Sequence, residues 1–432
     1  MLKIIKHTDK KYKVKLNSYI NKGTMTLERK SSIVRTILND IKKDGNKSLI
    51  RYIKKFENKK INTEKKLSVS ITEIKNAKKK CSKEFLDAVV LSIRRVSEYQ
   101  KKLLPKSFRY KDSIGMKLGC LWSPIDSCAL YVPGGKAFYP SSVIMNAVPA
   151  KLAGVKRIVI TTPTSEETIR PEILATAELL GIKEIYRCGG AQAIGAMTFG
   201  TKTINRVDKI VGPGNAYVAE AKKQVFGNVG VDSIAGPSEI MIIADKYNNP
   251  EWIALDLLSQ AEHDEEARPI LITDNQKIID SVNFYIKKHI KNLSREKIAK
   301  ASIISNGIAI CVSDINRSFE IINEIAPEHL EIMIKNSAKL VNNIRNAGAI
   351  FVGQFSPEAL GDYLAGPSHV LPTSGNARFD SGLSVLDFLK RTSYIESTKK
   401  SLGSVVNSIE SIAKSEGLDA HAKSAVVRFR KV

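Results

Sequence analysis

The pattern of hydrophobic and polar positions changes once along the chain, near residue 113. Before that point apolar residues recur every three or four positions, as at Ile33, Ile37 and Ile41, which predicts helices joined by short polar turns. After it, short β-branched runs recur, each followed by a turn and then a helical pattern. The predicted strands are 157–164, 184–190, 208–215, 239–245, 269–274, 308–314 and 348–354. The predicted helices are 171–181, 191–200, 214–226, 250–263, 314–325 and 329–345.

The alternation of these elements predicts the fold class. Strands that are apolar on both faces and alternate with helices are typical of parallel sheets covered by helices. The chain has 432 residues, which exceeds the usual size of one hydrophobic core. We therefore expect two α/β domains. From about residue 382 onward the strand pattern is lost and the chain is predicted to be helical.

The formal net charge of +24 is concentrated in the first quarter. Residues 1–112 hold 32 Lys and Arg against 11 Asp and Glu, which leaves 36 against 33 for the remainder. Most of these lysines fall between apolar positions, as on the solvated face of amphipathic helices. We favour this interpretation and expect no nucleic-acid partner. A protein that binds RNA or acts as a scaffold through this basic quarter is the alternative.

Other bulk features exclude several classes of protein. The five cysteines are widely spaced and form no C-x-x-C pair, which argues against a disulfide framework and a cysteine-built zinc site. No apolar run is long enough to cross a bilayer. The basic N-terminal stretch has no apolar core like that of a signal peptide. These features predict a cytoplasmic protein without membrane contact.

Three glycine-rich turns follow predicted strands, where open α/β sheets collect their ligands. They are 131–142, 188–196 and 211–221. Glycine lets the backbone approach a ligand, and the helix that follows offers free N–H groups to an anion. None is a full G-x-G-x-x-G motif, because Tyr217 replaces the third glycine of the last turn. Three such turns in about 110 residues favour a nucleotide or a similar anion over ligand-free turns.

Polar clusters around four of the six histidines suggest further chemistry. Gln260 and His263 stand at i and i+3 of a predicted helix, so both could meet one ion. Asp362 and His421 are candidates for its remaining ligands, and a polar helix end without a ligand is the alternative. Glu328 and His329 follow Pro327, which predicts a helix N-terminus carrying two acid/base groups. A capping Glu beside an incidental His would give the same pattern.

As a set, these motifs resemble those of the histidinol dehydrogenase family over essentially the whole chain. Their order and separations match the family. The motifs are YVPGGKAFYPSSVIMNAVPAKLAGV, GGAQAIGAMTFGT, DKIVGPGNAYVAEAK, AGPSEIMIIAD, DLLSQAEHD, APEHLEI, GDYLAGPSHVLPT and EGLDAHAKSAVVR. One departure is Ser368, where family members commonly carry Asn.

The resemblance implies a four-electron oxidation of L-histidinol to L-histidine through L-histidinaldehyde, the last steps of histidine biosynthesis. It implies NAD as oxidant, one Zn²⁺ per subunit that orients the substrate, and a homodimer with a shared active site. Glu328 would activate water and His329 would be the general base. The implied metal ligands are Gln260, His263, Asp362 and, from the partner subunit, His421. The implied further substrate contacts are Ser238, Glu416 and His369, and the implied NAD contacts are Tyr131, Gln192 and Asn215.

The resemblance also predicts two incomplete Rossmann-like domains. Residues 25–130 and 240–381 would form the first, with the metal and acid/base residues, and 131–239 the second, with the NAD-contacting turns. Residues 1–24 and 382–432 would form small helical segments, the latter used in the dimer. A metal-dependent hydrolase or lyase is the enzymatic alternative, although it leaves the glycine turns unexplained. Cys188, at a strand end near these turns, is expected to be structural because a hydrated aldehyde needs no covalent cysteine.

Overall fold

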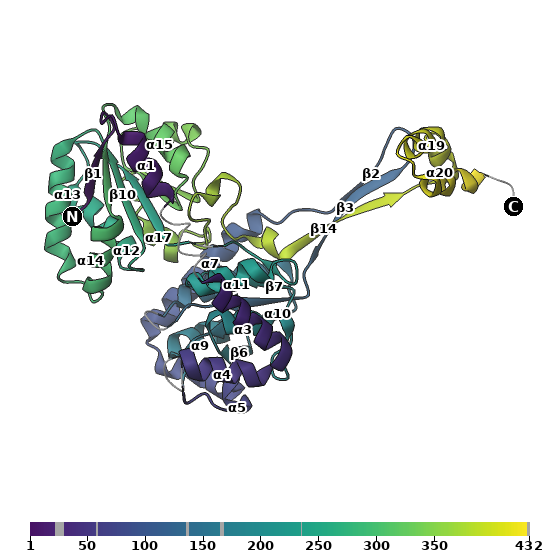
Figure 1. The fold of residues 1–432 in the computed structure, drawn as a ribbon, viewed down its shortest axis with the longest axis horizontal. Coiled ribbons are helices and arrows are strands. Elements are labelled where there is room, and N and C mark those ends of the chain that lie inside the picture. The colour runs from purple at the N-terminus through teal and green to yellow at the C-terminus, as the bar shows by residue number, and fades with distance from the viewer. Residues whose placement is uncertain (22–29, 58, 135–137, 165–167, 235, 430–432) are drawn as a thin grey trace.

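The computed structural model describes residues 1–21, 30–57, 59–134, 138–164, 168–234 and 236–429. Figure 1 shows two α/β bodies side by side and a long arm that projects away from both. No helix among the described residues is long and apolar enough to cross a membrane.

The first body is built on a six-stranded parallel sheet of order β1-β11-β10-β9-β12-β13. Its strands are β1 (Lys3–Lys6), β9 (Glu239–Ile243), β10 (Arg268–Thr273), β11 (Ile308–Cys311), β12 (His329–Ile332) and β13 (Ala349–Val352). Ile240 and Ile242 of β9 face one core, while Met241 and Ile243 face the other. This alternation explains why the predicted strand is apolar throughout, since helices cover both faces.

Helices of the first body cover the sheet on each side. On one side lie α12 (Pro250–Ala261), α13 (Gln276–Ile290) and α14 (Glu296–Asn306), and on the other α1 (Tyr12–Asn21) and α15 (Ser318–Ile325). The short helices α16 (Ser337–Leu340) and α17 (Glu358–Tyr363) complete this body, and α17 packs against α12.

The second body has a five-stranded parallel sheet of order β6-β5-β4-β7-β8. Its strands are β4 (Ser127–Tyr131), β5 (Arg157–Thr162), β6 (Glu184–Arg187), β7 (Lys209–Val211) and β8 (Gly230–Val231). The helices between them are α8 (Pro140–Ala153), α9 (Pro171–Leu179), α10 (Gly190–Phe199) and α11 (Ala216–Val225).

Both sheets have the same incomplete Rossmann order. In each sheet, three successive strands lie side by side in one direction, β4 to β6 or β9 to β11. The chain then returns, and the next two strands lie on the other side of β4 or β9. This reversal lies between β4 and β7 in one sheet and between β9 and β12 in the other. The predicted α/β class with two incomplete Rossmann-like units is confirmed.

The basic helices of residues 31–102 pack on the second body, which differs from the predicted grouping of 25–130 with the first. They are α3 (Ser31–Asp44), α4 (Asn46–Phe56), α5 (Glu64–Leu67), α6 (Ile71–Ala77) and α7 (Lys83–Lys102). Their apolar faces join the cores around α8–α11. Lysines occupy the outer positions, with Val34, Ile37 and Ile41 buried. Helical periodicity predicts that such a face is buried, but not which sheet buries it.

The arm is a three-stranded antiparallel sheet of order β14-β3-β2 that ends in a small helical module. Its strands are β2 (Phe108–Lys111), β3 (Lys117–Pro124) and β14 (Leu389–Glu396), and its helices are α18 (Lys399–Gly403), α19 (Val406–Ser415) and α20 (Asp419–Val426). The prediction that 382–432 is helical is therefore wrong for β14. This strand is largely exposed and pairs with a segment about 270 residues earlier, so it carries little local hydrophobic signal.

Two further local predictions are wrong in part. The N-terminal segment 1–24 was expected to be helical, and α1 is, but β1 pairs with β11 at the sheet edge. Residues 329–345 were expected to form a helix, and α16 does, but β12 occupies the centre of the sheet between β9 and β13. The run His329–Ile332 is buried throughout, and a short apolar run does not by itself distinguish a buried strand from a helix.

We expect Gly212→Ala to destabilise the protein much more than Gly227→Ala. Both glycines have positive φ, +108° and +96°, so each alanine costs roughly 1–2 kcal/mol of backbone strain. A Cβ at Gly212 would lie 2.2 Å from the Tyr131 carbonyl oxygen, whereas at Gly227 no atom lies within 4 Å. Thermal unfolding of the two variants measures the difference. Equal losses would show that the turn after β7 tolerates a side chain.

Candidate functional site

The acid/base candidates Glu328 and His329 lie where β12 begins, and the backbone of Glu239 in β9 holds both. The His329 Nδ1 lies 2.9 Å from the Glu239 carbonyl oxygen. Because a carbonyl only accepts, Nδ1 carries the proton and donates it there. The Glu239 N–H donates to Glu328 Oε2 at 2.8 Å. Both side chains are therefore oriented by one residue.

The bond at Nδ1 leaves Nε2 of His329 as a free acceptor. This atom is buried and has no hydrogen-bond partner among the described residues. Burial lowers the pKa of His329 to about 4, because the charged imidazolium is disfavoured away from water. The ring is thus neutral near pH 7 and presents a lone pair to any ligand beside it.

A buried ion pair fixes Glu239 in turn. Arg268 Nη1 donates to Glu239 Oε1 at 2.9 Å, and its Nη2 donates to the Tyr19 carbonyl at 2.7 Å. The guanidinium also lies over the Tyr19 ring, 4.2 Å from its centroid. The arginine thus ties α1 and β10 to the first residue of β9.

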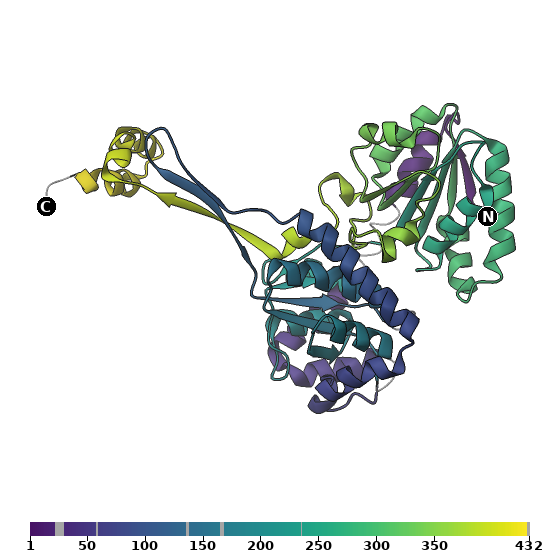
Figure 2. The same cartoon turned by 180° about the vertical axis from the view of Figure 1, so that it is seen from behind.

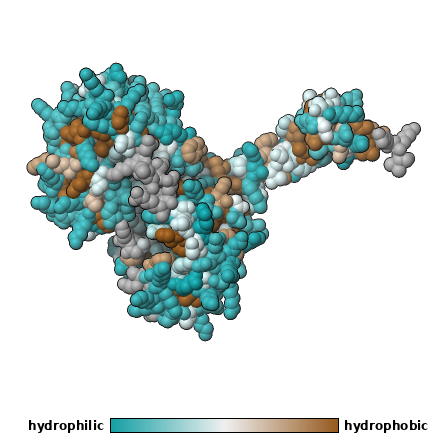
Figure 3. Space-filling model, viewed as in Figure 1, coloured by the Kyte–Doolittle hydropathy of each residue, from teal (hydrophilic) through white to brown (hydrophobic). Residues whose placement is uncertain are grey.

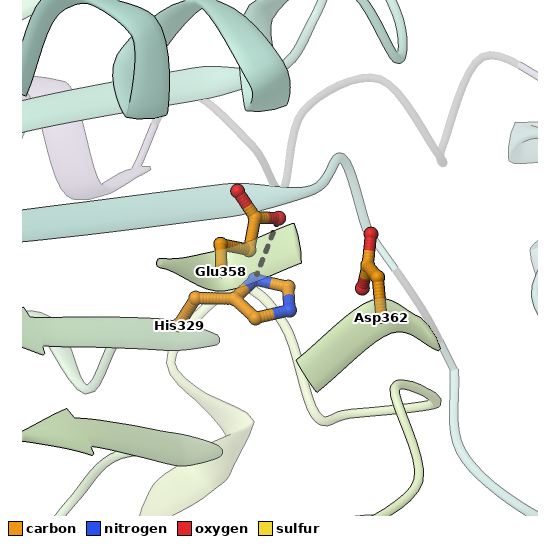
Figure 4. Close-up of side chains that lie close together, drawn as sticks. All are labelled: His329, Glu358 and Asp362. Atoms are coloured by element: carbon orange, nitrogen blue, oxygen red, sulfur yellow. Dashed lines mark ion pairs between the residues drawn. The ribbon is translucent and has the colours of Figure 1, made fainter. Parts of the chain in front are cut away.

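Carboxylates and an amide surround the same imidazole. Figure 4 shows His329 flanked by Glu358 and Asp362, both from α17. One ligand atom from each of the three lies within 4.8 Å of the others. Gln260 is fully buried at the end of α12. One end of its amide lies 2.9 Å from Glu358 Oε1 and 3.1 Å from the Glu239 carbonyl, and because both are acceptors, this end is assigned as the nitrogen. Its Oε1 is then available to a ligand.

Glu358 was missed by the sequence analysis. Only 2% of its surface is exposed, and burial raises its pKa well above the usual range, with Asp362 adding to the effect. A signal existed, since Glu358 and Asp362 stand at i and i+4 and so share a helix face. The local sequence of β12, HLEI, gave no hint that His329 lies opposite them.

His263 and His369 lie at the junction of the two bodies. His263 follows α12, and its ring centroid is 6.5 Å from that of Tyr139, which precedes α8 of the second body. Burial lowers the pKa of His263, which favours the neutral, ligating form. His369 Nδ1 lies 3.1 Å from the Asp362 carbonyl and its Nε2 lies 3.4 Å from Ser142 Oγ. Ser238 directly precedes β9.

The candidate metal ligands and the acid/base candidates gather at the amino ends of β9 and β12, whereas open sheets usually bind ligands at the carboxyl ends of their strands. The candidate NAD contacts lie at the carboxyl ends of the second sheet. There Tyr131 ends β4, Gln192 lies in the first turn of α10, and Asn215 caps α11 by accepting from the Tyr217 and Val218 N–H groups. Tyr131 and Asn215 flank the strand-order reversal between β4 and β7.

Glu416 and His421 are not brought to this cluster within one chain. Both are exposed and belong to the end of the arm, with His421 in α20. Figure 2 shows this end far from both sheets. Cys188, in contrast, is fully buried, and burial raises the pKa of its thiol to about 12. Such a thiol is not an activated nucleophile.

A comparison with protein families shows to which family the chain belongs. The model of the histidinol dehydrogenase family matches residues 20–429. The chain belongs to the histidinol dehydrogenase family. It is therefore an oxidoreductase of that family, and its motifs can be placed on the structure described above.

Similar proteins extend over nearly the whole chain. It is 46% identical to histidinol dehydrogenase 1 of Trichormus variabilis, covering 99% of this chain and 98% of that protein. It is 48% identical to the histidinol dehydrogenase of Gluconobacter oxydans, with 92% of each covered. The crystal structure of histidinol dehydrogenase from Elizabethkingia anophelis superposes with a TM-score of 0.91 at 36% identity, covering 99% of this chain and 98% of that one.

We expect Arg268→Met to destabilise the protein by about 3–5 kcal/mol, because Glu239 would stay buried without its cation. Adding Glu239→Gln to that variant should restore part of the loss, since the neutral amide removes the unpaired charge. Thermal or urea unfolding checks both. The exposed pair Lys117–Glu396 offers a control, and Lys117→Met should leave stability unchanged. No recovery in the double variant would contradict this account.

Proposed function

We propose that this protein oxidises L-histidinol to L-histidine through L-histidinaldehyde, with NAD as the oxidant and Zn²⁺ in the site. The observation that carries the proposal is the buried, unpartnered Nε2 of His329, which faces a set of carboxylate, amide and imidazole donors next to glycine-rich turns. Membership of the histidinol dehydrogenase family supports the substrate.

The donor set fits a zinc ion. Zinc accepts imidazole nitrogen and carboxylate oxygen, and a site that leaves positions open suits a substrate carrying its own imidazole and amine. His263, Asp362 and Gln260 would supply three ligands from one chain, and the partner's His421 the fourth. Glu358 would hold the Gln260 amide, so that Oε1 of Gln260 points to the ion.

NAD would accept the hydride, and Zn²⁺ would orient the carbinol group. The chain's residues would then handle the protons. In the first oxidation, Nε2 of His329 takes the hydroxyl proton as hydride leaves the carbinol carbon. Its Nδ1–H bond to Glu239 keeps the ring in the tautomer that this step needs. Ser238, Glu416 of the partner and His369 would contact the substrate.

The second oxidation needs water, because the aldehyde gains an oxygen. Glu328 would take a proton from that water as it adds to the carbonyl carbon. Burial raises the pKa of Glu328 well above the usual range, which makes the ionised carboxylate a stronger base. The N–H of Glu239 supports the ionised form. His329, protonated in the first oxidation, returns that proton to the carbonyl oxygen as water adds, which gives the neutral diol. It then removes a hydroxyl proton of this diol as the second hydride departs, and no covalent cysteine is required.

The working enzyme would be a homodimer, and the surface of the arm supports this part of the proposal. The arm carries large apolar side chains on its surface, as Figure 3 shows at its far end. Exposed are Phe108 and Ile395 on its strands and Ile412 and Val427 in its helical module. Such a surface is normally covered by a partner. In a twofold dimer, the arm of one subunit would place its His421 and Glu416 beside Asp362 of the other subunit.

The reaction should yield two NADH for each histidine formed. His329→Gln should lower kcat by roughly 10²–10⁴-fold, because the general base is lost, while NAD still binds. NADH absorbance with quantified histidine measures the ratio. His289→Gln is the control, since His289 pairs with Glu251 on the surface of α13. A zinc-loaded protein that produces no NADH from histidinol would contradict the proposal and leave the hydrolase or lyase alternative.

The shared site predicts complementation between two inactive variants. His263→Asn and His421→Asn chains, co-expressed with different affinity tags, should form a heterodimer with one intact site and about half of the wild-type activity. A His263→Asn and Asp362→Asn heterodimer should stay inactive, because both changes lie in the same wall and no site is intact. An inactive first heterodimer would show that His421 does not cross between subunits.

A further inference from the structure

Glu57 places a carboxylate beneath the glycine turn that begins α10. It directly follows α4, in the basic helical region that the proposed function leaves unused. Its Oε2 accepts from the Gly189 N–H at 2.8 Å, and its Oε1 accepts from Gln192 Nε2 at 2.5 Å. One carboxylate thus holds both the backbone and the side chain of this turn.

The setting of Glu57 is unusual for a carboxylate that only supports a fold. No cation pairs with it within the described part of the chain. Burial raises its pKa to about 7, although its two hydrogen bonds work against this rise. A desolvated charge costs stability unless it is well compensated, so its retention at this place points to a role in the site.

The geometry of the turn shows what Glu57 controls. Gly190 has φ +63°, and a Cβ there would lie 2.8 Å from Gln192 Oε1, so the Gln192 amide lies against the turn itself. The Gly190 N–H donates to the Tyr131 hydroxyl at 3.1 Å. Hydrogen bonds therefore hold this turn from two sides. Tyr131 contacts Gly190, and Glu57 holds Gly189 and Gln192, which Tyr131 does not contact.

We propose that Glu57 is a positioning residue for the cofactor, which holds Gln192 and the start of α10 in the arrangement that binds NAD. The proposal rests on the proposed function, in which Gln192 and Tyr131 contact NAD. Glu57 acts through Gln192 and touches no reacting atom. It gives the N-terminal helices α3 and α4 a part in cofactor affinity, because they carry Glu57 to the second sheet.

Glu57→Gln tests this with little change of shape. Its amide can still accept from Gly189, but its NH₂ group would face the NH₂ group of Gln192, which must rotate. We expect the Kd for NAD and the KM for NAD to rise roughly tenfold, with the KM for histidinol unchanged. Glu57→Asp keeps the charge but is too short for both donors, and it should fall between Glu57→Gln and wild type. If Glu57→Gln folds poorly, Glu57→Asp replaces it in the test.

Glu220→Gln is the matched control. Glu220 is buried in the second body and, like Glu57, accepts from a glutamine amide, Gln224 Nε2 at 2.7 Å. It lies within α11, away from the glycine turn of α10, so its substitution should leave NAD affinity unchanged.

The outcomes separate the two proposals. Calorimetric titration of the wild-type dimer with NAD comes first, and wild type that binds no NAD would overturn the proposed function and the role of Glu57 with it. Wild type that binds NAD, together with a folded Glu57→Gln variant of the same affinity, would overturn only the role of Glu57. Equal rises in KM for NAD and histidinol would also overturn it, since they indicate a general structural effect.

Discussion

The site depends on the first residue of β9. Glu239 uses its carbonyl to orient His329 and Gln260 and its N–H to hold Glu328, while Arg268 neutralises its side chain. The backbone groups at the start of a parallel strand are partly free of ladder bonds, so they can serve side chains from neighbouring elements. This explains why the acid/base groups gather at the amino ends of the first sheet, against the usual preference for carboxyl ends.

The candidate residues lie at opposite edges of two sheets of the same order. The second sheet offers the carboxyl ends of β4 and β7, where glycines allow close approach and helix N-termini favour an anion. The first offers the amino ends of β9 and β12, where the titratable groups lie. Tyr139 near His263 and Ser142 near His369 link the two. The proposed reaction requires a hydride acceptor close to the base, and the proposal assigns NAD to one of these edges and the base to the other.

Buried charge is concentrated around the site, where it forms hydrogen-bonded ion pairs. Arg268–Glu239 supports the acid/base residues, and Lys222–Asp232 joins both backbone groups of Gly212 at the β7 turn. Each pair costs desolvation that apolar side chains would avoid. Their shared position, under the strand ends that form the site, indicates that they fix local geometry. The excess of exposed lysine on α3–α7 has no comparable structural role.

The sequence by itself determined the α/β class, most strands and helices after residue 113 and the glycine turns, because these rest on short-range periodicity and turn chemistry. Tertiary structure alone decided that His329 begins a central strand, that Glu358 lies beside it, and that Leu389–Glu396 pairs with Lys117–Pro124 in an arm. Such pairings join segments far apart in the chain, and their energy comes from partners that local patterns do not contain. The assignment of residues 31–102 to the second body depended on packing for the same reason.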